Sequence, residues 1–393
     1  MNRNVWLLAL CQGLFLINNV ALIAVNGLVG LQLAPAAWMA TLPVMGYVVG
    51  GALATGLVAR SQRAWGRKRS FQFGLVVGMV AMGLCAWAAA SRQFAALVAA
   101  TAVAGYYNAN ASLYRFAAPE IAGPQYKEKA ISWVLAGGIL GAVVGPNLAA
   151  RTRDWFEMPF VGAYVALVLV AMLAFAVLSF IEFAPLPKHD PARPGRSLGE
   201  IARQPVFIVA VGAASLGYGV MSLLMSATPI AMDLCKHPFE STALVLEWHV
   251  LGMFVPSFFT GHLIKRFGAL KVMAAGVLLN LGCVAVALSG VDLMQFLVAL
   301  LLLGVGWNFL FVGGTTLFTE AYRPEEKTTA QAAMDFWVYT TMAITAFASG
   351  ALVSTQGWDW LNWGSLLPIG LIALALGWLA LQRRRNPAAA VAP

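Results

Sequence analysis

The sequence predicts an all-α polytopic membrane protein with twelve transmembrane helices in two pseudo-symmetric six-helix halves. Hydrophobic residues make up 60% of the 393 residues and charged residues only 10%, whereas a soluble domain carries roughly a quarter charged residues. The apolar residues fall in runs of about 20, the length that crosses the hydrocarbon layer as a helix. The distribution of basic residues and an internal repeat predict the same architecture.

The apolar runs set the predicted spans. The first six are 5–26, 38–59, 70–90, 94–116, 130–150 and 161–183, and the second six are 206–231, 243–263, 272–288, 295–317, 331–353 and 363–381. The first run is too long for a signal peptide and no small-residue cleavage site ends it. The Pro- and Gly-containing linker 184–205 separates an N-terminal bundle (1–183) from a C-terminal bundle (206–393), and its "SLGEIAR" predicts a short interfacial helix.

The basic residues orient the chain in the membrane. The chain contains 25 Lys and Arg and has a net charge of +9. All of them except Arg92, Arg151, Arg153 and Lys236 fall on the side shared by the two termini and the linker. The positive-inside rule therefore predicts that both termini are cytoplasmic. The net charge reflects this topology, and no basic soluble domain indicates a nucleic-acid partner.

The two halves also repeat in sequence. The segment "NANASLYRFAAPE" begins at Asn108 and "NFLFVGGTTLFTE" begins at Asn308, so that Glu120 and Glu320 recur at the same offset as the Asn pair. The segment "GLVARSQRAWGRK" (56–68) is echoed by "GHLIKRFGALK" (261–271), each between the second and third helix of its half. Repeated halves with a substrate site between them are typical of secondary transporters.

Two short motifs indicate a soft metal. "MSLLM" places Met221 and Met225 one helical turn apart, and "HVLGM" does the same for His249 and Met253. The seventh and eighth helices run antiparallel, so we expect Met225 level with His249 nearer the outer surface, and Met221 level with Met253 near the bilayer middle. Thioether sulfur and neutral imidazole suit Cu(I). Methionine is also an adaptable core filler, so packing is the alternative interpretation.

The chain resembles the major facilitator superfamily over essentially its full length. In the fifth helix, "GGILGAVVGP" (137–146) is similar to the family's glycine–proline signature. The family's loop signature, Gly-x-x-x-Asp-Arg-x-Gly-Arg-Arg, occurs in degraded form with a basic or neutral residue at the acidic position. The resemblance implies a gating role for the loop residues Gly56, Gly66, Arg67, Gly261, Arg266 and Gly268.

Three segments resemble a narrower group, the CcoA-type copper importers. They are 221–232, 247–268 and 304–322. Those importers are bacterial inner-membrane facilitators associated with supplying copper to cytochrome c oxidase, and they carry paired Met and His motifs on the seventh and eighth helices. The resemblance implies that Met221, Met225, His249 and Met253 pass Cu(I) inward by alternating access. Copper is then the substrate, no cofactor is tightly bound, and we expect a monomer in the lipid bilayer.

Five further residues are second-tier candidates. Cys235 and His237 lie in the outer loop above the seventh and eighth helices and are a possible metal relay. Glu247 lies at the same outer mouth. Asp335, inside the eleventh helix, is a candidate proton or gating site, and Arg115 ends the fourth helix. A solvated helix end or an interface anchor explains each of the charged residues equally well.

A riboflavin or other small organic solute transporter is the alternative function. Relatives that resemble riboflavin transporters share the framework of the copper importers, so the framework alone does not decide the substrate. Polar and aromatic residues on helices expected to line the cavity would suit a flat heteroaromatic ring with polar edges. They are Asn18, Asn19, Asn108, Asn110, Asn308, Tyr106, Tyr107 and Trp307.

Other classes of function are disfavoured. The sequence has no Gly-x-x-x-x-Gly-Lys-Ser/Thr loop for ATP and no His-Glu-x-x-His pair, so we predict a transporter and not an enzyme. A copper sensor or assembly factor could use the same ligands, but the short termini and linker leave no room for a signalling or docking domain.

Overall fold

A computed structural model describes residues 3–122, 133–134, 137–183, 196–323 and 326–385. The first half contains α1 (Arg3–Leu33), the 3-10 helix η1 (Ala37–Met39), α2 (Leu42–Ala90), α3 (Phe94–Ala111), α4 (Tyr114–Ala122), α6 (Gly138–Thr152) and α7 (Val161–Ser179). The linker ends in α8 (Leu198–Ala202). The second half contains α9 (Pro205–Leu234), α10 (Phe239–Phe254), α11 (Ser257–Phe267), α12 (Ala269–Ala287), α13 (Leu293–Phe318), α14 (Lys327–Thr355) and α15 (Trp358–Arg385).

Each predicted span coincides with a helix in the described part of the chain. Nine helical stretches there are long and apolar enough to cross a membrane, and the bent pair α10–α11 makes a tenth. The other two predicted spans correspond to α3, whose end "YYNANA" is polar, and to α6, the start of whose predicted span lies outside the described residues. The all-helical membrane fold predicted from the sequence is therefore confirmed.

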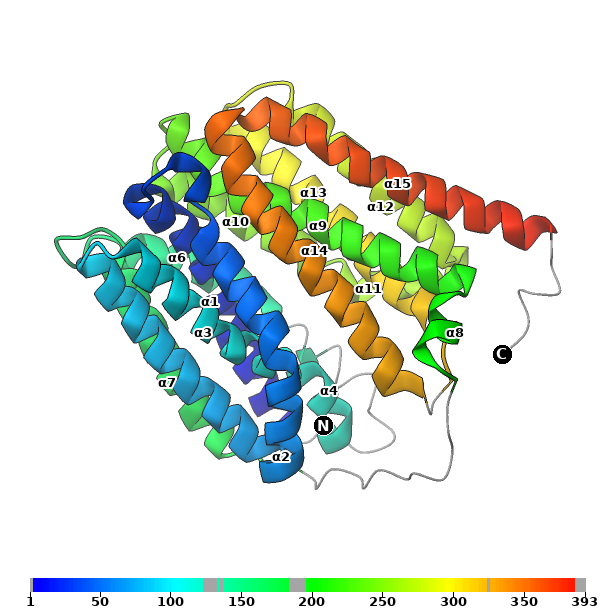
Figure 1. Ribbon diagram of the computed structural model, residues 1–393, viewed down its shortest axis with the longest axis horizontal. Helices are drawn as coiled ribbons and strands as arrows, with labels where there is room; N and C mark the ends of the chain where they lie inside the picture. The colour runs from blue at the N-terminus through cyan, green and yellow to red at the C-terminus, as the bar shows by residue number, and fades with distance from the viewer. Residues whose placement is uncertain (1–2, 123–132, 135–136, 184–195, 324–325, 386–393) are drawn as a thin grey trace.

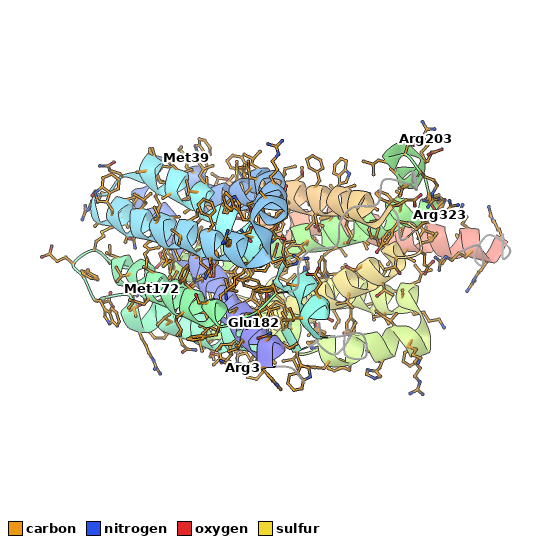
Figure 2. All side chains as sticks on the ribbon, turned by 90° about the horizontal axis from the view of Figure 1, so that it is seen from below. Arg3, Met39, Met172, Glu182, Arg203 and Arg323 are labelled. Atoms are coloured by element: carbon orange, nitrogen blue, oxygen red, sulfur yellow. The ribbon has the colours of Figure 1, made fainter. Side chains whose placement is uncertain are left out.

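The helices form two bodies (Figure 1). The helices α1, α2, α3, α6 and α7 gather in one, and α9 to α15 gather in the other. The start of α1 and the end of α15 lie toward the same end of the molecule as α8, which we call the linker face; η1 lies toward the opposite face. Figure 2 shows Arg203 and Arg323 together at one end and Met39 near the other. The domain boundaries at 183 and 206 remain predictions.

Two spans, the fourth and the eighth, differ in detail from the prediction. The second and third spans both lie in α2, which is divided by a kink at Gly66, whose φ of 76° suits glycine because it has no Cβ. The fourth span divides into α3 and α4. The eighth is bent by 41° between α10 and α11, where Pro256 has no backbone N–H to continue the helix. Hydropathy marks apolar length and does not mark such breaks.

The halves are joined near the opposite face. The helix pairs α1 and α9, α2 and α14, and α6 and α10 are in contact. The Thr41 hydroxyl accepts a hydrogen bond from the Gly350 amide at 3.1 Å, and the Asn147 side chain donates to the Glu247 carboxylate at 2.8 Å. These contacts join the second helix to the eleventh and the fifth to the eighth, as the internal repeat requires. The conformation is thus closed at the opposite face.

Ion pairs lie at the linker face of each half. Arg67 donates to the Glu120 carboxylate through Nε, 2.5 Å from Oε2, and through a second nitrogen. In the second half the repeated acid, Glu320, accepts from Arg383 at the end of α15, at 2.6 Å. The position that corresponds to Arg67 is Ala269, directly after Gly268, so the second half takes its arginine from a different helix.

Candidate functional site

The four soft-ligand candidates lie inside the second half. Met221 and Met225 lie on α9, and His249 and Met253 lie on α10, each no more than 6% exposed. The described residues include no group of three or more His, Cys, Asp or Glu side chains that could hold a metal ion. A Cu(I) site would therefore depend on thioether sulfur and one imidazole. Ligation by these four residues remains a prediction.

His249 is fixed by the neighbouring helix α13. Its Nδ1 lies 2.7 Å from the Leu300 carbonyl oxygen. Because a carbonyl only accepts, Nδ1 carries the hydrogen and Nε2 carries the lone pair. Nε2 is buried and has no hydrogen-bond partner among the described residues. A Cβ on Gly304 would lie 2.3 Å from the His249 carbonyl oxygen, so glycine allows this close approach of α13.

The two relay candidates, Cys235 and His237, differ in their contacts. Cys235 is exposed and lines a pocket of about 920 Å³ at the opposite face, beside Asp359. Partial burial and the Asp359 carboxylate raise the pKa of the Cys235 thiol, which lowers the thiolate fraction available to a metal. The His237 Nε2 lies 2.8 Å from the Val291 carbonyl, and its ring packs against Phe296. Only Nδ1 of His237 then remains available as a relay ligand.

The other charged candidates, Glu247, Asp335 and Arg115, belong to three different helices. Glu247 accepts a hydrogen bond from Asn147 and thereby joins the two halves. Asp335 is half-buried about two turns into α14. Arg115 lies in α4, and its side chain is outside the described part of the chain.

The gating-loop candidates divide into two kinds. Gly66 and Gly268 both have positive φ, 76° and 87°, at the turn between the second and third helix of each half. Arg67 forms the ion pair with Glu120, whereas Arg266 is exposed and its guanidinium lies 5.2 Å from the Phe267 ring centroid. A Cβ added at Gly56 or Gly261 would meet nothing within 4 Å, so space alone does not require glycine there.

Several polar candidates are used in packing. The Asn308 amide is fully occupied by α10 and α11. Asn110 donates to the Ser70 carbonyl at 2.9 Å. The Tyr106 hydroxyl donates to Ser61 at 3.2 Å. In this conformation the hydrogen bonds of these three side chains join neighbouring helices or turns, and among their amide atoms Asn110 Oδ1 is buried without a partner in the described structure.

A set of aromatic rings connects the two halves. Tyr107, Tyr218 and Tyr339 are neighbours of Tyr47 in the fold, and a Cβ on Gly51 would lie 3.7 Å from the Tyr339 ring. These residues come from α2, α3, α9 and α14. The inter-half ring cluster, as we call it, comprises Tyr47, Tyr107, Tyr218, Tyr339, Trp307, Phe311 and Phe254.

The second half contributes a stack of rings to this cluster. Trp307 and Phe311 are parallel, with an interplanar angle of 10° and centroids 5.0 Å apart. Tyr218 meets Trp307 edge-on at 5.2 Å, and Phe254 lies 6.3 Å from Trp307. Tyr218, Tyr339, Phe254 and Phe311 are only half-buried. Part of their surface can therefore contact a ligand.

Polar atoms without partners accompany these rings. The hydroxyls of Tyr47 and Tyr107, the indole N–H of Trp307 and both amide atoms of Asn18 are buried without a well-formed hydrogen bond in the described structure. The Tyr107 hydroxyl does lie beside the Asn18 amide. The amide of Asn108 lies near the same region, 3.4 Å from a Cβ position on Gly51. Buried polar groups are normally paired, so these atoms are suited to meet a polar ligand.

Comparison with known sequences identifies the family. The sequence profile of the Major Facilitator Superfamily matches residues 5–248 and 239–393. This chain belongs to the Major Facilitator Superfamily. This facilitator is 39% identical over 394 residues to the riboflavin transporter RfnT of Brucella anthropi, covering 99% of this chain and 98% of the relative. It is 28% identical to the uncharacterized MFS-type transporter YddS of Bacillus subtilis over 86% of this chain and 82% of that protein.

Solved structures support the same fold for this facilitator. The nucleoside transporter NupG superposes with a TM-score of 0.71 at 12% identity, covering 97% of this chain and 99% of that one. A bacterial homologue of the iron transporter ferroportin in an inward-facing state gives a TM-score of 0.67 at 16% identity, covering 95% and 98%. At such identities the likeness shows the fold alone.

Part of the ring cluster in this facilitator was not predicted from the sequence. Tyr107 and Trp307 were predicted, whereas Tyr47, Tyr218 and Tyr339 were not. The available signal was a tyrosine within each of three predicted spans. That signal is weak because tyrosine is also common at membrane interfaces, and only the fold brings the three helices together.

Proposed function

We propose that this facilitator carries a small organic solute with a flat heteroaromatic ring, of the riboflavin class, across a bacterial inner membrane by alternating access. The observation that carries the proposal is the inter-half ring cluster with its unpaired polar atoms. The relative named a riboflavin transporter supports the same substrate class. Among the functions considered from the sequence, this one is favoured over copper import.

The geometry suggests how such a solute is bound. The Trp307–Phe311 stack presents aromatic surface from the second half, and aromatic rings prefer offset or edge contacts with other rings. Asn18 and Tyr107 present amide and hydroxyl groups from the first half. A ring with polar edges would bridge the two halves. Rocking of one half against the other would then expose the solute to alternate sides.

The sidedness follows from charge. The Lys and Arg residues favour a cytoplasmic linker face, with both termini inside. The contacts near the opposite face, at Thr41 and at Asn147, then close the outer side. On this proposal the conformation described is inward-facing. We further propose that the protein acts as a monomer.

Copper import remains a second candidate, favoured by one observation. His249 has a buried, unpaired Nε2, and its Nδ1–H is held by the Leu300 carbonyl, an arrangement that also orients metal-bound histidines. Met221, Met225 and Met253 belong to the same apolar cluster of buried residues. On this alternative Met225 and His249 receive Cu(I) first. Supply to cytochrome c oxidase rests on the sequence resemblance only.

Uptake into proteoliposomes tests the substrate. Riboflavin and, under reducing conditions, radioactive copper are offered to wild type, Trp307→Leu and His249→Leu. We expect wild type to take up riboflavin. In Trp307→Leu the KM for riboflavin should rise roughly tenfold, which corresponds to the free energy of one lost aromatic contact. His249→Leu should change this KM less than about threefold.

A matched tryptophan gives the control. Trp363 is 57% exposed and lines the pocket at the opposite face, so Trp363→Leu should leave riboflavin uptake unchanged. Copper uptake without riboflavin uptake, abolished in His249→Leu, would replace the proposal by the copper alternative.

A further inference from the structure

The eighth membrane segment is broken at a defined place. Helix α10 ends at Phe254, α11 begins at Ser257, and their axes differ by 41°. Pro256 has no N–H, so the regular bonding of α10 stops with the bond from Val255 to the Leu251 carbonyl. The break leaves backbone carbonyls inside the membrane region without helical donors, where unpaired polar groups are costly.

One side chain of α13 bonds to both sides of this break. The Asn308 Nδ2 donates to the Met253 carbonyl at 2.7 Å, before the break. The same nitrogen donates to Ser257 Oγ at 2.7 Å, and Asn308 Oδ1 accepts from Thr260 Oγ1 at 2.7 Å, both after the break. Asn308 is 1% exposed. Its amide therefore bonds to residues on both sides of the break in the bent form of the segment.

The break adjoins both the ring cluster and the other half. Trp307 precedes Asn308 in the chain, and Phe254, the last residue of α10, lies 6.3 Å from the Trp307 ring. A Cβ on Gly138 of α6 would lie 3.1 Å from the Phe254 ring. Phe254, a member of the ring cluster, thus lies next to both Trp307 of the second half and α6 of the first half. A change in the bend must move it relative to one of these neighbours.

We propose that Asn308 is a positioning residue that sets the bend of α10–α11 and so couples the substrate site to the relative position of the two halves. In the conformation described, the bend is present and the halves are closed at the opposite face. Without the amide, the Met253 carbonyl is paired only if the segment straightens, so the equilibrium moves away from this conformation. The inference rests on the proposed function only for the choice of riboflavin as transported probe.

Distance measurements between the halves test the coupling without any substrate. Spin labels are placed at Arg69 and Lys271, exposed residues of the two halves at the linker face, in a Cys235→Ser background. The other cysteines, Cys11, Cys85 and Cys283, are buried. In lipid nanodiscs, Asn308→Ala should raise the population with the shorter distance between the labels about tenfold relative to the population with the longer distance. A shift of this size is expected because the substitution leaves the buried Met253 carbonyl unpaired in the bent form.

A double variant separates coupling from simple stability. Pro256→Ala restores the missing N–H, so Pro256→Ala/Asn308→Ala can form a straight helix with its carbonyls paired. We expect it to fold as wild type does, to keep the shorter distance, and to transport riboflavin with a lowered maximal rate at nearly unchanged KM. Asn280→Ala is the control, because Asn280 is an equally buried amide on α12 whose polar atoms bond to no described residue.

Two outcomes overturn the inference. One is an unchanged distance distribution in Asn308→Ala. The other is a double variant whose transport and distances return to wild type, because Asn308 would then serve only to pair the broken backbone. Should wild type carry no riboflavin, the proposed substrate fails while the distance measurements still decide the coupling.

Discussion

At the scale of single residues, glycine controls how closely the first and fifth membrane segments approach. A Cβ on Gly141 would lie 2.4 Å from the Leu16 Cβ, and one on Gly137 would lie 2.2 Å from the Ala9 carbonyl oxygen. Real Cβ atoms do not make such contacts, so α1 and α6 could not pack as they do with larger residues. Small residues are enriched at membrane helix interfaces for this reason.

A pair of glycine substitutions tests this packing. Gly141→Ala should destabilise the protein by about 1–3 kcal/mol, the usual effect of overpacking, seen as a lower Tm in detergent. Gly56→Ala has open space around it and should be neutral or stabilising by up to about 1 kcal/mol. Equal losses in the two variants would contradict a steric role specific to Gly141.

At the residue scale, the sequence predicted which side chains are candidates for function but not which residues they contact. Asn108 and Asn308 occupy repeated positions, yet Asn308 is occupied by α10 and α11, whereas Asn108 lies beside Gly51 and Tyr339. In the sequence, both residues appear as an asparagine within an apolar span. The partner depends on Pro256, Ser257 and Thr260, whose meeting with Asn308 follows from the fold.

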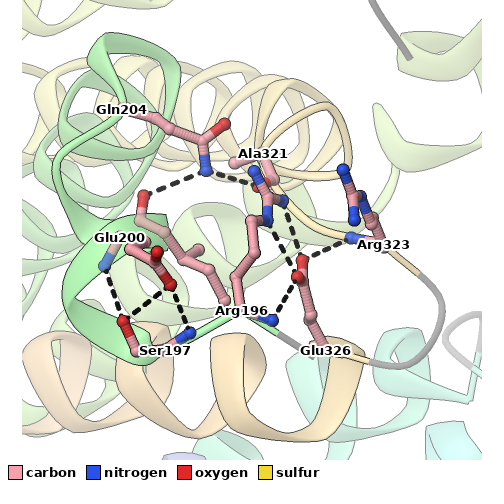
Figure 3. Close-up of polar contacts among 8 residues, drawn as sticks. Arg196, Ser197, Glu200, Gln204, Ala321, Arg323 and Glu326 are labelled. Carbon is pink, nitrogen blue, oxygen red and sulfur yellow. Dashed lines mark hydrogen bonds and ion pairs between the residues drawn. The ribbon is translucent and has the colours of Figure 1, made fainter. Parts of the chain in front are cut away.

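At the scale of elements, the short helix α8 is fixed to the loop before α14 (Figure 3). The Arg196 guanidinium donates to both oxygens of Glu326 at 2.8 Å, and the backbone N–H groups of Arg196 and Arg323 donate to the same carboxylate. Ser197 and Glu200 cap α8 reciprocally. Bonding to Arg196, followed by the backbone donors, lowers the pKa of Glu326 to about 2.

The lowered pKa predicts how stability depends on pH. The folded protein favours the ionised Glu326, so its contribution is complete above the ordinary carboxyl pKa of 4.5 and is lost as the pH falls toward about 2. Glu326→Gln should lower Tm by a few degrees near neutral pH. The difference from wild type should shrink as the sample is acidified below 4.5, in thermal scans.

An exposed acid at the same face gives the comparison. The Glu320 side chain is 49% exposed and pairs with Arg383, and exposed ion pairs contribute little to stability. Glu320→Gln should therefore change Tm less than Glu326→Gln. A difference for Glu326→Gln that is constant with pH would show that its ionisation is not what fixes α8.

Elements were predicted better than their breaks. The spans, the linker helix in "SLGEIAR" and the turns near Gly66 and Gly268 follow from apolar length, a capping pattern and glycine chemistry, all of which are local. The bend at Pro256 was not predicted, because a proline can kink a membrane helix or be tolerated in it according to the neighbouring groups that pair the freed carbonyls.

At the scale of the whole molecule, two related contacts close the opposite face. Thr41 accepts from the Gly350 amide, and Asn147 donates to Glu247. Helices α1 and α9 of the two halves are also in contact, and a Cβ on Gly27 would be 3.7 Å from the Ser226 carbonyl. A structure that alternates between two faces must break both contacts in each cycle.

Loosening these contacts should open that face. In a Cys235→Ser background carrying Ser226→Cys, we expect Thr41→Val/Asn147→Ala to raise the rate of thiol labelling several-fold, since Ser226 is 2% exposed while the halves are joined. Thr228→Val is the control, because the Thr228 hydroxyl bonds only to the Leu224 carbonyl of its own helix. Labelling that is no faster than in the control would mean that other contacts close this face.

The repeated acids Glu120 and Glu320 pair with arginines from different helices, Arg67 and Arg383. This difference affects the order in which ion pairs can form during synthesis of the two halves. When Glu120 leaves the ribosome, its arginine, Arg67, has already been made, and Glu326 likewise finds Arg196 already present. Glu320 must wait for Arg383, which is made 63 residues later. The first bundle can therefore form its ion pair as soon as Glu120 is made, whereas in the second bundle the pair at Glu320 forms only after all of α15 has been synthesised.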